Sequence, residues 1–338
     1  MRRFGLAALA AIAPLNLGSV DVKAQETAAT ALPYGVTALG PVTVAQSDRY
    51  RFESRHVGKA FLVDVIRIDA PLAPPAPRLP VVFVPDGNVM TTLIPAIANL
   101  ASLESLPSMI VVGISYDFGA ASPQEARLQG FARRFTDFTP STDEESQTLA
   151  MAVTEQLFGM AWPDDAPFGR ADAFLAFIEE ELKPFIAARY SSADVDDGTL
   201  FGHSLGGLFA LHVLFTSPES FRRYIALDPT PWGDALAREE AALGDVSAHL
   251  FLGVSGALPP SAPAGSPTPA DLTAALDEQI RNSARQGLRY TYTLYQDETH
   301  NSVPAVGAMT GLRTVLGLAP TPSSIAAPPG ASPEPSSL

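Results

Sequence analysis

Short apolar segments alternate with longer helical patterns along most of this 338-residue chain, and this alternation constrains the fold most strongly. The strand-like segments are rich in β-branched residues or alternate with period two, and they lie at 60–68, 79–86, 108–116, 222–229, 249–255 and 289–296. The helical patterns lie at 90–104, 171–190, 206–217, 269–287 and 303–317. Such alternation predicts an α/β fold with a mainly parallel sheet covered by helices on both faces. An active site in such a sheet lies beyond the carboxyl ends of the strands.

One turn in this pattern carries a chemical signal. The segment Thr199 to Phe215, TLFGHSLGGLFALHVLF, is typical of a strand, a tight turn and a helix, with Gly202-x-Ser204-x-Gly206 on the turn. This is the setting of a nucleophile elbow, in which a serine with a strained backbone is exposed above the sheet and small neighbours let the strand and helix approach closely. The pattern predicts Ser204 as a catalytic nucleophile.

A serine nucleophile needs a general base, and the candidates are His56, His203, His212, His249 and His300. His203 is expected to point away from the serine beside it, and His212 in a helix and His249 at a strand start suggest structural roles. His56 precedes the central sheet. His300 follows the last predicted strand, so its loop can reach over the serine. This chain order, serine and then a late histidine, matches the α/β-hydrolase arrangement and predicts His300 as the base.

The oxyanion of an acyl-transfer intermediate needs two hydrogen-bond donors. One is expected from the backbone N–H of Leu205, and the other from the loop after an earlier strand. The segment VVFVPDGNVM ends such a strand, and Gly87 there allows close backbone approach. We therefore expect the backbone N–H of Asn88 as the second donor, although an ordinary Asp-Gly turn would have the same dipeptide.

Several blocks of the sequence resemble a bacterial esterase family that includes siderophore (enterobactin-type) esterases. They are ESRHVGKAFLVDV, VVFVPDG, RRFTDFTP, ADAFLAFIEEELKPFIAARY, TLFGHSLGGLFALHVLFTSPESFRRYIALDP and DETHNSVP, between about Arg51 and Leu316. The resemblance implies an α/β-hydrolase fold, the elbow serine as nucleophile and the late histidine as base. It implies ester hydrolysis and extends distantly to S-formylglutathione hydrolases, feruloyl esterases and mycolyl transferases. We expect this hydrolysis to need no cofactor or metal ion.

The acid that would orient the histidine is less clear from the sequence. The segment after strand 249–255, GVSGALPPSAPAG, holds no carboxylate, although α/β-hydrolases commonly place the acid there. Asp228 ends the strand next to the elbow strand, a position from which some lipases supply their acid, and it is the favoured candidate. Asp297 and Glu298 in the histidine loop are alternatives, and a dyad without an acid stays possible. For Asp228 the competing interpretation is a turn-initiating residue before proline.

The two ends of the chain differ from its centre. Residues 1–24 have a charged start, an apolar stretch and small residues before a cleavage point, which predicts a signal peptide and a secreted or periplasmic protein. Residues 319–338 are dominated by Pro, Ser and Ala and are predicted to be disordered. Between them, 25–318 form the expected α/β-hydrolase domain, with an insertion or lid at about 121–169 that holds the adjacent cations Arg133 and Arg134.

Composition excludes several classes of function. A net charge of -14 gives no basic surface for nucleic acid, and no run after the signal segment is long enough to span a bilayer. The absence of cysteine excludes thiolate nucleophiles and cysteine-ligated zinc. The expected partner is a small-molecule ester, with the oligomeric state left open. An acyltransferase and a binding protein that has lost its chemistry are the alternatives.

Overall fold

The computed structural model describes residues 46–318 except 142, 165 and 284. The predicted signal peptide, 1–24, and the predicted disordered tail, 319–338, lie outside the described residues.

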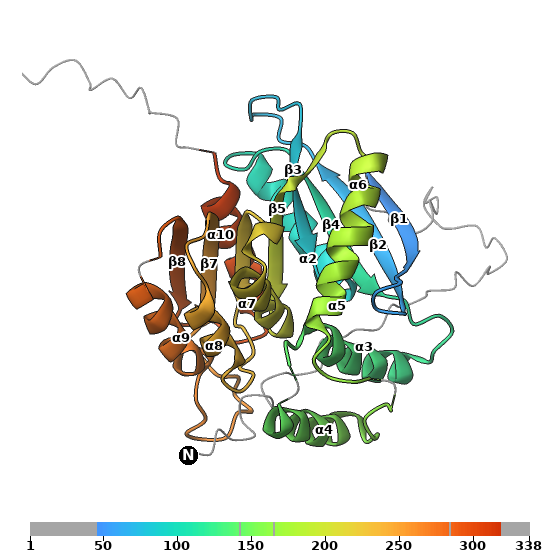
Figure 1. Cartoon of the computed structure of the whole chain (residues 1–338), viewed down its shortest axis with the longest axis vertical. Coiled ribbons are helices and arrows are strands. Elements are labelled where there is room, and N and C mark those ends of the chain that lie inside the picture. Colours follow the sequence, from blue (N-terminus) through green and yellow to red (C-terminus); the bar gives the residue numbers. More distant parts are fainter. Residues whose placement is uncertain (1–45, 142, 165, 284, 319–338) are drawn as a thin grey trace, which may run out of the picture.

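The centre of the fold is one eight-stranded sheet with the strand order β1-β2-β4-β3-β5-β6-β7-β8 (Figure 1). Its strands are β1 (Ser47–Glu53), β2 (Ala60–Ile68), β3 (Leu79–Val84), β4 (Met109–Tyr116), β5 (Ala193–His203), β6 (Arg223–Leu227), β7 (Ala248–Ser255) and β8 (Leu288–Tyr295). Strand β2 pairs antiparallel with β1 and β4, whereas all pairs from β4 to β8 are parallel. The carboxyl ends of the parallel strands β3 to β8 therefore lie at one edge of the sheet.

Helices cover both faces of this sheet, as the alternation of patterns predicted (Figure 1). Helices α2 (Gly87–Ser102) and α10 (Val303–Leu316) pack on one face. The other face carries most of the remaining elements: α3 (Pro123–Phe138), α5 (Ala171–Ala176), the π-helix η2 (Phe177–Leu182), α6 (Lys183–Arg189), α7 (Leu205–Thr216), α8 (Ala235–Ala242) and α9 (Pro269–Ser283). Successive residues of β3 alternate between the two cores, with Val81 and Phe83 in one and Val82 and Val84 in the other. This two-sided burial explains why the central strands are continuously apolar.

The segment predicted as an insertion forms α3 and α4 (Glu144–Phe158) in most of its length. Ser122 begins α3 with a capping box, because its hydroxyl accepts from the backbone N–H of Glu125 while the Glu125 side chain accepts from Ser122 N–H. Asp143 caps α4 through Ser146 N–H, and Gly159, with φ 63°, ends it in a left-handed conformation.

Aromatic side chains attach this segment to the rest of the protein. Trp162 stacks on Phe168 with 4.6 Å between ring centroids, and Phe168 stacks on Trp232 at 5.9 Å. Trp232 is almost fully buried and donates its indole N–H to the carbonyl oxygen of Ser141 at 2.9 Å. The loop after β6 is thereby packed against the predicted insertion.

Among the described residues, no helix is both long and apolar enough to cross a membrane. Two proline-rich segments, 70–80 and 257–269, lie mostly in the connections before β3 and before α9.

Candidate active site

Ser204 lies between β5 and α7, at the turn that the sequence predicted as an elbow. Its backbone has φ 60° and ψ −121°, a conformation that a residue with a side chain adopts only under constraint. A Cβ atom on Gly202 would lie 1.9 Å from the carbonyl oxygen of Gly206, and one on Gly207 would lie 2.9 Å from that of Leu227. Gly202 in the motif and Gly207 just after it therefore provide the space in which strand and helix meet at this angle.

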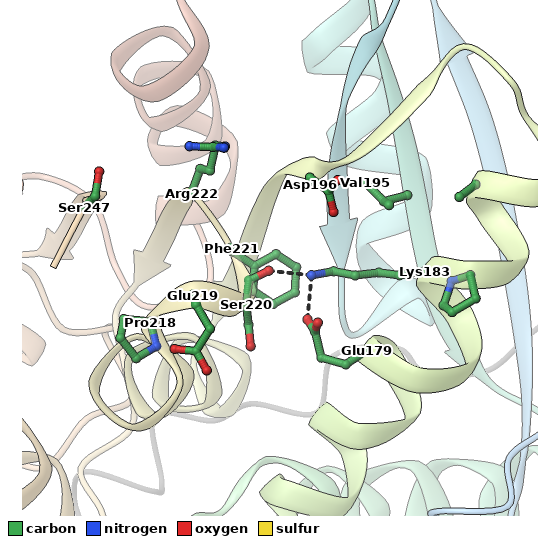
Figure 2. Close-up of a pocket in the computed structure, with 12 residues that line it drawn as sticks. Glu179, Lys183, Val195, Asp196, Pro218, Glu219, Ser220, Phe221, Arg222 and Ser247 are labelled. Atoms are coloured by element: carbon green, nitrogen blue, oxygen red, sulfur yellow. Dashed lines mark hydrogen bonds and ion pairs between the residues drawn. The ribbon is translucent and has the colours of Figure 1, made fainter.

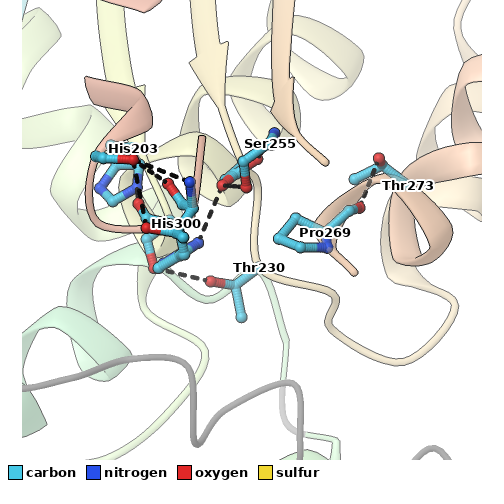
Figure 3. A network of polar contacts seen from close by, with 10 residues as sticks. His203, Thr230, Ser255, Pro269, Thr273 and His300 are labelled. Atoms are coloured by element: carbon cyan, nitrogen blue, oxygen red, sulfur yellow. Dashed lines mark hydrogen bonds and ion pairs between the residues drawn. The ribbon is translucent and has the colours of Figure 1, made fainter. Parts of the chain in front are cut away.

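The loop between β8 and α10 brings His300 to this serine. His300 Nε2 lies 3.0 Å from Ser204 Oγ, and Thr230 Oγ1 lies 3.2 Å from the same hydroxyl oxygen (Figure 3). The three residues are buried, and Ser204 is only 1% exposed. The distance to the imidazole is that of a hydrogen bond, so the serine proton can pass to His300.

Asp228 follows β6, the strand next to the elbow strand, and faces the other side of the imidazole. Its Oδ2 lies 3.3 Å from His300 Nδ1. Ser255, at the end of β7, fixes the carboxylate by donating from its backbone N–H to Oδ1 at 2.7 Å and from its hydroxyl to Oδ2 at 2.5 Å. Ser255 thus lies at the end of β7, where the sequence offers no carboxylate as the catalytic acid. It instead binds Asp228, the candidate acid at the end of the neighbouring strand β6.

The two other candidate acids lie differently. Asp297 is exposed and Glu298 is half-buried. The described part of the chain records no hydrogen bond or ion pair between His300 and either carboxylate. The backbone of Glu298 instead ties the histidine loop to its surroundings, because its N–H donates to Tyr295 and its carbonyl oxygen accepts from Ala257.

His203, which was expected to point away from the serine beside it and to be structural, lies against the base. Its Nε2 lies 2.8 Å from the carbonyl oxygen of His300, and the two imidazole rings have centroids 4.6 Å apart (Figure 3). A carbonyl oxygen only accepts, so His203 donates through Nε2–H. Burial, together with the neighbouring His300 and Arg134, holds the pKa of His203 well below its usual value, and the ring is neutral.

The two expected oxyanion donors belong to the first turns of two helices. Leu205 is the first residue of α7, and Asn88 is the second residue of α2. Backbone N–H groups at these positions have no acceptor within their own helix. The Asn88 side chain is fixed separately, because its Oδ1 accepts from Tyr116 N–H at 2.7 Å and its Nδ2 donates to the Tyr116 carbonyl oxygen at 3.2 Å. The Asp-Gly dipeptide therefore begins a helix and is not an isolated turn.

Comparison with known families identifies the chain. Residues 66–251, more than half of it, match the family described as "Putative esterase". The chain belongs to this esterase family.

Curated relatives support the same grouping. The chain is 34% identical over 160 residues to the siderophore triacetylfusarinine C esterase of Aspergillus fumigatus, covering 47% of this chain and 46% of that one. It is 35% identical over 170 residues to the ferri-bacillibactin esterase BesA of Bacillus subtilis, covering 49% and 53%. The aligned residues span about half the length of these esterases.

Solved structures extend the likeness over more of the chain. The BES protein of Bacillus cereus matches 84% of this chain and 100% of its own with 25% identity and a TM-score of 0.63. An IroE-like serine hydrolase of Shewanella oneidensis matches 80% of both chains with 25% identity and a TM-score of 0.62. The α/β-hydrolase fold expected for an esterase of this family is thereby confirmed.

The two adjacent arginines of α3 are engaged within this esterase fold. Arg134 makes a two-pronged ion pair with Asp86, at 2.6 and 2.9 Å, and its side chain is 3% exposed. The Arg133 guanidinium lies over the rings of Phe61 and Tyr116, at 4.8 and 4.3 Å from their centroids. Both cations therefore stabilise the fold around the site, and neither extends freely into solvent toward a substrate.

Among the residues that the structure describes, one group of side chains has atoms close enough to share a metal ion. His203, Asp228 and His300 each present a nitrogen or carboxylate oxygen, all within 4.8 Å of one another. Their atoms already bond to the Ser204 hydroxyl, to Ser255 and to the His300 carbonyl oxygen. This donor set is better suited to proton transfer than to holding a cation.

A separate pocket of about 520 Å³ lies near the amino ends of β5, β6 and β7 (Figure 2). Lys183 lines it, donates to the carbonyl oxygen of Ser220, pairs with Glu179 at 2.5 Å and lies 4.2 Å from the centroid of the Phe221 ring. The charge of Lys183 is thus satisfied within the chain itself. Because this pocket is at the opposite end of the strands from Ser204, it does not belong to the candidate active site.

Proposed function

We propose that the chain is a serine hydrolase of carboxylic esters, with Ser204 as nucleophile, His300 as general base and Asp228 as the orienting acid. The observation that carries the proposal is the 3.0 Å contact between Ser204 Oγ and His300 Nε2, in a chain of an esterase family. Nucleophile and base within hydrogen-bond distance, with a third group against the base, are the arrangement needed for acyl transfer.

In the first half-reaction, His300 Nε2 accepts the proton as Ser204 Oγ attacks the ester carbonyl carbon. The carbonyl oxygen becomes an oxyanion, and the backbone N–H groups of Leu205 and Asn88 stabilise it. Collapse of this intermediate breaks the carbon–oxygen bond of the ester, and the proton on His300 passes to the leaving alcohol. The acyl group is then bound to Ser204.

In the second half-reaction, a water molecule replaces the alcohol. His300 accepts a proton from this water as it attacks the acyl carbon, and then returns the proton to Ser204 Oγ as the carboxylic acid leaves. The imidazolium formed twice in the cycle carries its Nδ1–H toward Asp228 Oδ2, 3.3 Å away. Thr230 and Ser255 support the geometry through the serine hydroxyl and the aspartate, respectively.

Small-molecule siderophore esters are the substrate class we propose, because two relatives are named as esterases of siderophores. We also propose that the protein is exported to the periplasm or the medium and begins at Gln25 after removal of 1–24. Mass spectrometry of exported protein tests the second proposal, and an intact Met1 would contradict it.

A panel of esters tests the activity. It should include p-nitrophenyl esters of short and long acids, an aryl ester and a cyclic tri-ester siderophore with and without iron. We expect hydrolysis by the wild type, none above background by Ser204→Ala, and the highest kcat/KM for the siderophore ester. Hydrolysis of the simple esters alone would contradict the substrate class and leave the chemistry intact.

The two alternatives have distinct outcomes in the same assay. With an added alcohol acceptor in dilute aqueous solution, a dominant transfer product would indicate an acyltransferase. A folded wild-type protein that binds esters and turns over none would indicate a binding protein.

A further inference from the structure

The residue before the Asn88 helix is an aspartate with an unusual conformation. Asp86 caps the amino end of α2 with φ 65° and ψ 32°, in the left-handed region, and it makes no side-chain capping hydrogen bond. An aspartate at this position ordinarily turns its carboxylate to the first-turn N–H groups of the helix. Here the carboxylate points elsewhere, although it is 6% exposed and has little contact with water.

Arg134 holds the carboxylate away from the helix. Its Nε donates to Asp86 Oδ1 at 2.6 Å and its Nη2 donates to Oδ2 at 2.9 Å, so the fork of the guanidinium takes both oxygens. Helix α3, which carries Arg134, is itself fixed by the buried side chains of Phe131, Phe135 and Phe138. The arginine therefore approaches Asp86 from a rigid element.

One of the N–H groups that the carboxylate leaves uncapped, that of Asn88, belongs to the proposed oxyanion site. Within α2, the N–H groups of Val89 and Met90 donate to the Asp86 carbonyl oxygen, at 2.9 and 3.0 Å. The N–H groups of Gly87 and Asn88 are the two that have no acceptor inside the helix. A capping aspartate would compete for the Asn88 N–H, because the second and third helical positions are those that an N-cap side chain reaches.

The Asp86 carboxylate also lies against α7, the helix whose first residue, Leu205, is the other proposed oxyanion donor. A Cβ atom on Gly206, in the first turn of α7, would lie 3.2 Å from Asp86 Oδ2. A negative charge between the first turns of α2 and α7 opposes a second negative charge on an oxyanion bound there. The guanidinium of Arg134 compensates this charge at direct contact.

We propose that Arg134 is a positioning residue of the oxyanion site: it holds the Asp86 carboxylate away from the Asn88 N–H and compensates its charge. This inference rests on the proposed ester hydrolysis. The two partners of the ion pair then differ in their effect on activity. Asp86 without Arg134 would block the oxyanion site, whereas Arg134 without Asp86 would not.

The test compares Arg134→Gln, Asp86→Gly and the double variant, using an ester that the wild type hydrolyses. Glycine suits the left-handed backbone at position 86 and removes the carboxylate. For Arg134→Gln we expect kcat to fall about a hundredfold, the loss typical of one oxyanion donor, with KM changed less than about threefold. For Asp86→Gly we expect a loss below about tenfold, and the double variant should regain at least about tenfold over Arg134→Gln.

A trifluoromethyl ketone, which forms a tetrahedral adduct with its oxygen in the oxyanion site, gives a second readout. Its affinity should fall with kcat in Arg134→Gln, since both depend on the same donors. Equal losses in Arg134→Gln and Asp86→Gly, or a double variant no faster than Arg134→Gln, would overturn the proposal. If Arg134→Gln does not fold, Arg134→Lys with and without Asp86→Gly tests the positioning role alone, because lysine keeps the charge and loses the two-pronged contact. A kcat of Arg134→Lys equal to that of the wild type would then overturn the positioning role.

Arg285→Gln is the matched control. Arg285 pairs with the buried Glu240 at 2.7 Å, between α9 and β8, so its loss also leaves a carboxylate buried without its arginine. We expect Arg285→Gln to lower the free energy of unfolding about as much as Arg134→Gln does. Its kcat should stay within about twofold of the wild-type value. If the wild type itself hydrolyses no ester, the proposed function fails first; an active wild type with an unaffected Arg134→Gln overturns this inference alone.

Discussion

His203 donates a hydrogen bond through Nε2 to the carbonyl oxygen of His300 at 2.8 Å, so the residue before the nucleophile holds the backbone of the base. The rings of the two histidines also lie 4.6 Å apart. The elbow and the histidine loop, separated by almost a hundred positions in the sequence, are thereby joined at two points.

Loss of this contact should misplace the base. His203→Phe keeps a ring against His300 but removes the hydrogen-bond donor to its carbonyl oxygen. We expect kcat to fall by about ten- to a hundredfold, because a displacement of the base by about 1 Å has an effect of this size. Steady-state kinetics on a hydrolysed ester provide the measurement. His249→Phe, a buried histidine at the start of β7, is the control. A His203→Phe enzyme as fast as this control would contradict the role.

The identity of the acid is tested by two isosteric changes. We expect Asp228→Asn to lower kcat at least about a hundredfold with little change in folding, because the asparagine cannot stabilise the imidazolium. Glu298→Gln should lose much less activity, since its carboxyl group has no recorded contact with His300. If Glu298→Gln loses its activity while Asp228→Asn keeps most of it, the orienting acid belongs to the histidine loop. If neither of these changes nor Asp297→Asn alters kcat, the enzyme uses a dyad.

The elbow glycine is tested through stability. In Gly202→Ala the new Cβ would lie 1.9 Å from a backbone oxygen of α7, and no side chain can move to relieve this contact. We expect a loss of more than about 3 kcal/mol in the free energy of unfolding, measured by urea titration. Gly244→Ala is the control, because a Cβ there has nothing within 4 Å. Equal stability of the two variants would show that strand and helix do not approach as described.

His212 should make stability depend on pH. Burial lowers its pKa, but hydrogen bonds to Asp172 and Glu239, each at 3.0 Å, outweigh this effect and raise the pKa to about 9. Because the folded pKa exceeds the unfolded value of about 6.5, the stabilisation is complete below pH 6.5 and is lost as the pH rises through 9.

The comparison with His212→Asn isolates this contribution. The difference in unfolding free energy between wild type and variant should be largest near pH 6 and should shrink near pH 9.5. A difference that stays constant over this range would show that His212 is neutral in the folded protein.

Much of the fold could be predicted because the central strands and the long helices carry strong periodic signals. Strand β1 could not, since its sequence SDRYRFE is polar and it lies at the edge of the sheet, largely exposed and paired only with β2. The π-helix η2 was also missed, because the change from α to π geometry leaves no mark in the apolar pattern of 171–190.

The site shows the same division. The elbow motif and the late histidine indicated Ser204 and His300 because their signals are local. Thr230 and Ser255 were not predicted, since each acts through a contact between residues about 26 positions apart that only the parallel pairing of β5, β6 and β7 creates. For Ser255 the sequence held one signal. The segment after β7 has no carboxylate, so a residue there could only support an acid from another strand.

The reactivity of Ser204 tests the central claim most directly. The folded protein is incubated with a fluorophosphonate, and intact-protein mass spectrometry followed by peptide mapping locates the adduct. We expect one adduct per chain, on Ser204, absent in Ser204→Ala and formed slower by about a thousandfold or more in His300→Gln, where the base is missing. A folded wild-type protein that forms no adduct, or forms it on another residue, would contradict the assignment of Ser204 as an activated nucleophile.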